Sequence, residues 1–155
     1  MLEWLKRHAW KACSRLKRLT GSNPVLSAVF RNIFCAMILK FEEMGKTLLP
    51  QFKGGKKELA ANMFFDGTNR IFKGCLCPGA SIGVHTHDDS CEVIFIISGK
   101  GILHETADVE KVGVMHSMLV SQGDCLYCPK GSSHSLENPS DAQSDLVFHA
   151  VVAKQ

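Results

Sequence analysis

Three histidines and one glutamate stand at spacings that suit a single metal site. His85 and His87 are two residues apart in a stretch typical of a β-strand, where residues i and i+2 point to the same face. Glu92 follows a short polar stretch that we interpret as a turn, and His134 follows the turn-forming Pro129–Gly131. Neutral imidazoles bind zinc, copper, iron or nickel, and a carboxylate adds affinity for manganese. Three nitrogens and one carboxylate leave positions open on a six-coordinate metal, and chemistry takes place at open positions.

These four residues belong to two longer patterns. Residues 79–99 read G-x5-H-x-H-x4-E-x6-G, and residues 123–138 read G-x5-P-x-G-x2-H-x3-N. In this order, and without a missing position, the two patterns resemble both signature motifs of the cupin superfamily. The resemblance covers roughly residues 58–153. It implies an all-β fold, the double-stranded β-helix or jelly-roll barrel, with one divalent transition metal (Mn, Fe, Zn, Ni or Co) held by His85, His87, Glu92 and His134.

The resemblance implies a metal and a small-molecule ligand, and it leaves the reaction open. Small cupins resemble oxalate-decarboxylase-like, dioxygenase, sugar-isomerase and lyase proteins, in which a metal binds an oxygen-rich small molecule. One hypothesis is therefore a metal-dependent enzyme acting on a small oxygenated organic acid or sugar-like compound. The alternative is a non-catalytic module that binds or senses a metal or a small ligand. A fold alone does not select between these two classes.

Side-chain alternation predicts what else faces the cavity. If Glu92 points inward, so do Ile94 and Ile96, and an inward His134 brings Leu136 with it. The cavity should then be partly apolar and sized for one ligand. Four polar or ionisable residues are candidates for its rim, and the first three also for catalysis: Tyr127, His149, Arg70 and His104.

The other face of the same strand predicts an interface. Val93, Phe95 and Ile97 point outward as an apolar stripe, and a hydrophobic helix is expected at residues 25–43. Apolar patches of that size are uncommon on soluble monomers, and cupins of this type commonly dimerise through a sheet face. We therefore expect a homodimer.

The pattern of short strands begins after residue 45, and we place the barrel at residues 45–155. An Asp66–Asn69 turn with an Asp-Gly core predicts a hairpin between the first two strands. Many short strands with Gly/Pro turns favour a sandwich or barrel. About nine strands are expected: Leu59–Phe65, Arg70–Cys77, Ser81–Thr86, Glu92–Ser98, Gly101–Glu105, His116–Val120, Cys125–Cys128, His134–Glu137 and Asp145–Ala153.

Residues 1–44 are predicted to be a separate basic segment of two helices. Residues 1–43 hold eight Lys/Arg against three Asp/Glu, whereas residues 44–155 hold ten against twelve. The first helix is amphipathic and ends at Gly21–Pro24. The second runs from Val25 to Met44 and stops at Gly45, and its charged residues argue against a transmembrane span.

Four interpretations of this segment stay open. It packs as a helical hairpin on the barrel or a partner subunit, or residues 1–20 contact a membrane surface through Trp4, Trp10 and a Lys/Arg face. A DNA-reading helix-turn-helix is a poor match without a third helix, so no nucleic-acid partner is expected. In the fourth interpretation, translation starts at Met44 and the segment is not native.

Length and cysteine usage fit one intracellular domain. A chain of 155 residues with 45% hydrophobic content suits a single domain with a proper core. The seven cysteines come without a signal peptide, so we expect reduced thiols and a cytoplasmic location. Cys125 and Cys128 have C-x-x-C spacing, but on a strand their sulfurs point to opposite faces. A redox or zinc role is therefore not expected for them.

Overall fold

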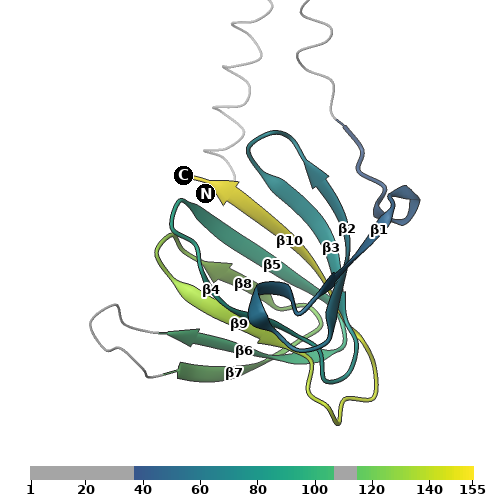
Figure 1. Ribbon diagram of the computed structural model, residues 1–155, viewed down its shortest axis with the longest axis vertical. Coiled ribbons are helices and arrows are strands. Elements are labelled where there is room, and N and C mark those ends of the chain that lie inside the picture. The colour runs from purple at the N-terminus through teal and green to yellow at the C-terminus, as the bar shows by residue number, and fades with distance from the viewer. Residues whose placement is uncertain (1–36, 107–114) are drawn as a thin grey trace, which may run out of the picture. The chain divides into compact units, whose positions relative to one another are not determined.

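The computed structural model describes residues 37–106 and 115–155. The chain divides into two compact units, residues 1–38 and 39–155, and the second carries the motifs. Its described part contains two 3₁₀ helices, η1 (Phe41–Glu43) and η2 (Phe52–Gly54), and ten strands (Figure 1). The strands are β1 (Lys46–Pro50), β2 (Glu58–Phe65), β3 (Arg70–Leu76), β4 (Ser81–Thr86), β5 (Ser90–Ser98), β6 (Lys100–Thr106), β7 (Met115–Ser121), β8 (Cys125–Cys128), β9 (Ser133–Glu137) and β10 (Leu146–Lys154).

The strands form two antiparallel sheets. One has six strands in the order β1-β2-β3-β10-β5-β8, and the other has four in the order β4-β9-β6-β7. Figure 1 shows that strands far apart in the sequence lie side by side, as β10 does between β3 and β5. The chain passes repeatedly from one sheet to the other, as in a jelly-roll barrel. The fold class expected from the sequence is confirmed.

The core lies between the two sheets and follows the alternation of the strands. In β5, Ile94 and Ile96 are buried while Phe95 and Ile97 are exposed, as predicted. Phe148 on β10 is fully buried, and its ring packs edge-on against that of Phe72. The four-stranded sheet contributes a second set of buried apolar side chains, Ile82, Leu103, Val120 and Leu136, and Ala80 just before β4 joins them. This core holds the sheets together independently of the polar residues of the motifs.

The hairpin predicted at residues 66–69 is confirmed, and its turn is built by Asp66. The Oδ1 atom of Asp66 accepts hydrogen bonds from the backbone N–H groups of Thr68 (2.8 Å) and Asn69 (2.6 Å). Gly67 occupies the left-handed region with φ +99°, which glycine adopts without strain. The turn sets the register in which Phe65 pairs with Arg70.

Three local expectations are wrong. The structure contains β1, which was not predicted from the sequence. Only Leu49 of its residues is partly buried, so the strand carries little of the apolar pattern that predicts a strand. Strand β5 begins at Ser90, two residues before the expected start, so the turn before it is shorter. Residues 37–44, expected as the end of an α-helix, hold only the short η1. The rest of the predicted helices lies outside the described residues.

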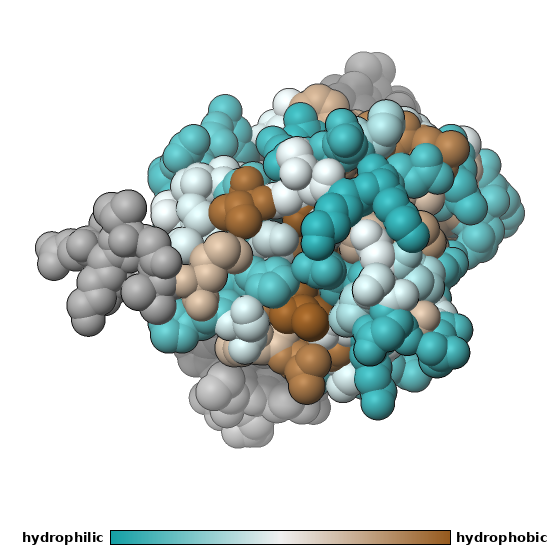
Figure 2. Space-filling model, turned by 60° about the horizontal axis from the view of Figure 1, so that its bottom comes forward, coloured by the Kyte–Doolittle hydropathy of each residue, from teal (hydrophilic) through white to brown (hydrophobic). Residues whose placement is uncertain are grey.

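Among residues 37–106 and 115–155, no helix is long and apolar enough to cross a membrane. On the face seen in Figure 2, apolar side chains gather in small areas separated by polar ones. Surfaces of that kind are ordinary for folded domains, because polar groups never cover a protein completely.

Candidate metal centre

Two of the four predicted ligands come from neighbouring strands of the four-stranded sheet. His85 on β4 lies directly opposite His134 on β9, and their ring centroids are 4.6 Å apart. The pairing of adjacent strands is therefore what brings together two residues that are far apart in the sequence. His134 is buried and His85 is partly buried.

His87 is positioned by a turn and not by a strand. It lies one residue beyond the end of β4, so the expectation that both histidines share a strand is wrong. Its N–H donates to the carbonyl of Ser132 (3.1 Å), and its own carbonyl accepts from the N–H of Gly131 (2.8 Å). These bonds attach His87 to the Pro129–Gly131 turn, which leads into the strand of His134. The rings of His87 and His134 stack with centroids 5.1 Å apart.

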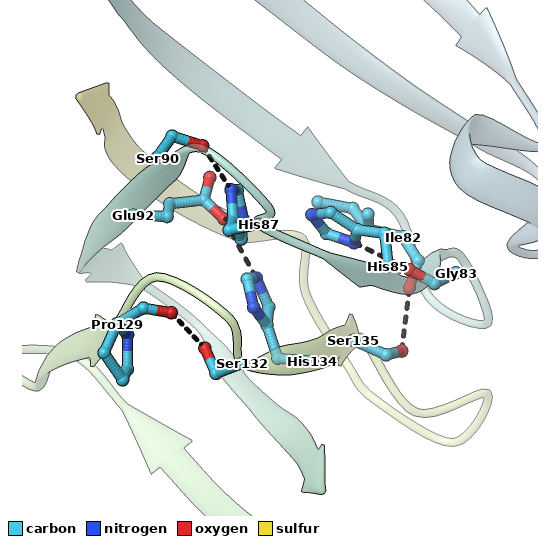
Figure 3. A network of polar contacts seen from close by, with 10 residues as sticks. All are labelled: Ile82, Gly83, His85, His87, Ser90, Glu92, Pro129, Ser132, His134 and Ser135. Atoms are coloured by element: carbon cyan, nitrogen blue, oxygen red, sulfur yellow. Dashed lines mark hydrogen bonds and ion pairs between the residues drawn. The ribbon is translucent and has the colours of Figure 1, made fainter. Parts of the chain in front are cut away.

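Glu92 completes the cluster from the six-stranded sheet. Its Oε2 atom lies 3.2 Å from His87 Nε2 and 2.9 Å from His134 Nε2, and Figure 3 shows the three side chains turned toward one another. The side chain of Glu92 is buried. Burial acts to raise the pKa of this carboxyl, but hydrogen bonds from His134 and His87 outweigh it and lower the pKa to about 2. Glu92 is therefore an anion at neutral pH.

The second nitrogen of each imidazole decides which atom is free to act as a ligand. His85 Nδ1–H donates to the Gly83 carbonyl at 3.0 Å, which leaves the lone pair of Nε2 free. His87 Nδ1 lies 3.1 Å from the hydroxyl of Ser90, which can donate or accept. His134 Nδ1 is buried without a hydrogen-bond partner. Burial also lowers the pKa of His85, which favours the neutral imidazole that a metal requires.

The arrangement fits one metal ion. Each residue offers one donor atom, and the four donor atoms all lie within 4.8 Å of one another. Ligands about 2.1 Å from a common metal stand about 3 Å apart when adjacent and about 4 Å apart when opposite, so only small movements are needed. Three neutral nitrogens and one carboxylate carry a single negative charge. A divalent ion would therefore leave a net positive charge that suits an anionic ligand.

A cavity of about 540 Å³ opens beside this cluster. His85, His87 and Glu92 line one side of it. Arg70, a predicted rim residue, also lines it, together with Lys53 of η2, which sequence reasoning missed. A ligand in the cavity would therefore reach three of the four donor residues.

Three other predicted rim residues lie away from the cavity. Tyr127 is 62% exposed and pairs with the outward Val93, so it points out of the barrel. His149 pairs with the outward Phe95, and its ring lies 5.0 Å from that of Phe41. His104 contacts Ser117 and Glu137 on the outer face of the smaller sheet. The expectation that these three line the cavity is wrong, because the register across the loops was not readable from sequence.

One further carboxylate was missed. Glu105 on β6 lies directly opposite His134, so its side chain is on the face of the sheet that carries His134. Burial, followed by the charges of Glu92 and Glu105, raises the pKa of the Cys128 thiol to about 12. Both carboxylates therefore act on the same buried thiol. The sequence could have indicated this orientation, because residues i and i+2 on a strand share a face and Leu103, two positions earlier, is a buried residue.

The fold and this donor set define a cupin, and the comparisons agree. The family described as "Cupin domain" matches residues 73–151, just over half of the chain, and the chain belongs to this family. An oxalate-binding protein of Thermotoga maritima is 28% identical over 122 residues, which cover 75% of this chain and 93% of that protein.

Solved structures show the same fold. A crystal structure from Thermotoga maritima, described as a predicted oxalate decarboxylase, has a TM-score of 0.66 and 25% identity, covering 77% of this chain and all of that one. A cupin 2 conserved barrel domain protein from Salinispora arenicola has a TM-score of 0.57 and 20% identity, covering 78% and 91%. The likeness to the Salinispora arenicola protein shows a shared fold alone.

Proposed function

We propose that this cupin binds one divalent transition metal through His85, His87, Glu92 and His134, and that the metal's open positions bind a small carboxylic acid. The observation that carries this proposal is the convergence of four donor atoms within 4.8 Å beside a cavity. A metal held there would act as a Lewis acid toward the carboxylate oxygens of a ligand. The likeness to an oxalate-binding protein supports a ligand of this class.

Elemental analysis of protein purified without added metal tests the metal claim. We expect about one ion per chain in the wild type and loss of most of it in His87→Ala and His134→Ala. His149→Ala is the matched control, because it removes an imidazole from the outer face of the barrel and should leave the metal content unchanged. Full metal retention in both ligand variants contradicts the proposal.

Calorimetry with oxalate tests the ligand class. Oxalate should bind the metal-loaded protein, and a chelator should abolish the binding because the carboxylate oxygens are held by the metal. Equal oxalate binding with and without metal would place the anion elsewhere, and would refute the role of the open positions.

Catalysis is a second candidate function, favoured by Glu105. A carboxylate on the face of the sheet that carries His134 is suited to moving a proton to or from a ligand at the open positions. The reaction would be of the decarboxylase, dioxygenase, isomerase or lyase type on a small oxygenated acid or sugar-like compound. Glu105→Gln should then keep the metal and lose turnover. Mass spectrometry of the products measures the turnover. A variant with full turnover removes Glu105 from catalysis.

We also propose a cytoplasmic homodimer. The described cysteines are free thiols, as expected in a reducing compartment. On the outer face of the larger sheet, Phe95 and Ile97 are 46% and 40% exposed, and the exposed Tyr127 lies on the same face opposite Val93. A second copy would cover this apolar face. Light scattering should give a dimer mass that falls to the monomer value in Phe95→Asp, and a wild-type monomer at tens of micromolar would contradict the proposal.

A further inference from the structure

The cavity beside the metal centre is much larger than oxalate. Its volume is about 540 Å³. Oxalate consists of two carboxylates joined directly, so it would occupy the end nearest the donor residues and leave most of the space to water. Pockets of about 300–1,000 Å³ enclose ligands of considerably greater size.

Apart from the donors, the cavity is lined mainly by apolar side chains. Six hydrophobic side chains line it: Leu49, Phe52, Leu59, Met63, Phe72 and Val152. Besides the donor Glu92, the charged side chains around it are two cations, Lys53 and Arg70, and two carboxylates, Asp88 and Asp89. Asp89 also forms an ion pair with Lys154 at 3.4 Å, and the remaining charges are of both signs. Apolar contact is the interaction that this wall provides.

One side of the apolar wall is formed by the end of β1 and by the connection from β1 to β2. Leu49 and Phe52 pack against the buried core. The following residues lie directly against β4, where a Cβ on Gly83 would stand 2.1 Å from the carbonyl oxygen of Lys53, and a Cβ on Gly55 would stand 2.0 Å from that of Ser81. Glycine at both positions is what permits this close approach.

Hydrogen bonds hold the same connection in place. The N–H of Ser81 donates to the carbonyl of Lys56, and the N–H of Lys56 donates to the hydroxyl of Ser81, both at 2.9 Å. Gln51, Lys53 and Lys57 all have positive φ values of 47°, 56° and 54°. Such left-handed conformations are unfavourable outside glycine, and they cluster where a segment is fixed for ligand contact.

We infer that the ligand of this protein is a carboxylic acid with an apolar body, whose chelating head binds the metal and whose body lies against Leu49, Phe52 and Met63. This inference rests on the proposed function and names its ligand class more closely. A preformed wall contributes affinity because its ordering is completed during folding and not on binding. Each additional buried methylene should tighten binding about fourfold.

Three 2-oxo acids with the same chelating head, and oxalate as the reference without an apolar body, test the inference on the metal-loaded full-length chain. Calorimetry would compare oxalate, pyruvate, 2-oxopentanoate and phenylpyruvate. We expect 2-oxopentanoate to bind about fifteenfold more tightly than pyruvate, because it buries two more methylenes. Equal affinities along the series would overturn the inference while leaving the metal-dependent carboxylate site intact. Absence of binding by every acid would refute the proposed function itself.

Two variants locate the apolar wall. Phe52→Ala and Met63→Ala should each reduce the gain from pyruvate to 2-oxopentanoate to less than about fourfold, with pyruvate affinity unchanged within about twofold. Met63 is partly exposed, so its truncation is the safer change for folding. Leu48→Ala is the control, because Leu48 is exposed and does not line the cavity. The assignment of the wall would be contradicted if both wall variants kept the full gain in affinity from pyruvate to 2-oxopentanoate. It would also be contradicted if Leu48→Ala reduced that gain as much as the wall variants do.

Discussion

Glu92→Gln should remove an acid-dependent part of the stability of the metal-free barrel. The pKa of the Glu92 carboxyl is about 2 in the folded chain, against an ordinary value of 4.5. Burial opposes this shift, and the hydrogen bonds from His134 and His87 outweigh burial. A carboxyl whose pKa is lower in the folded than in the unfolded chain stabilises the fold above its unfolded pKa. That stabilisation is lost as the pH falls toward the folded pKa.

The magnitude follows from the size of the shift. At pH 7 the lowered pKa of Glu92 corresponds to about 3 kcal/mol of stabilisation, of which about 2 kcal/mol should be lost between pH 7 and pH 3. Glutamine has no charge to lose over this range. The difference in the free energy of unfolding between the wild type and Glu92→Gln should therefore be largest at pH 7 and shrink toward pH 3.

Urea unfolding with a chelator present measures this difference. The transition should be followed by circular dichroism, which reports on the strands of the barrel. Glu58→Gln is the matched control, since Glu58 is an exposed glutamate on β2. If Glu92→Gln stayed within about 0.5 kcal/mol of the wild type at pH 7, or followed it in parallel to pH 3, the pairing of Glu92 with the two histidines would not stabilise the fold.

Three further perturbations test the barrel itself. Gly83→Ala should destabilise it by about 1–3 kcal/mol in urea unfolding, because the new Cβ would overlap a backbone carbonyl, whereas Gly45→Ala has open space and should be nearly neutral. Phe148→Ala, at a fully buried ring, should cost about 3–5 kcal/mol, and a cost below about 1 kcal/mol would contradict the packing. Iodoacetamide at pH 8 should label the exposed Cys125 before Cys75, since burial raises the pKa of Cys75 to about 11. Peptide mass mapping measures the order of labelling, and earlier labelling of Cys75 would contradict this prediction.

The strands and the four candidate ligands were predictable because local signals specify them. Alternation of apolar residues gave most strand bounds within two residues, and the motif spacing selected four side chains that do converge. The alternation of inward and outward side chains along β5 was also predictable, since Glu92 and Ile96 lie on the buried face as expected. The strand bounds and the alternation depend on residues close together in the sequence, and the ligands were selected by the spacing within two separate motifs.

What could not be predicted depends on register and on contacts between distant segments. Tyr127 points outward because it pairs with Val93, and that register is set across a loop whose geometry the sequence does not specify. His87 is held by backbone hydrogen bonds to the Pro129–Gly131 turn, which carry no side-chain signal. The apolar wall at Phe52 belongs to a short segment with positive φ values at residues other than glycine, where propensity predicts no structure.

Most of the hydrogen-bonding groups of the donor cluster have partners within the cluster or beside it. This determines how metal binding is coupled to folding. Glu92 accepts from the Nε2–H groups of His87 and His134, so its buried charge has partners before any metal arrives. When Nε2 binds a metal, the ring proton moves to Nδ1, and the Ser90 hydroxyl can accept it from His87. The apolar core packs between the sheets without these residues. Metal should therefore add stability to an already folded barrel, in contrast to small domains that fold only around their zinc ion.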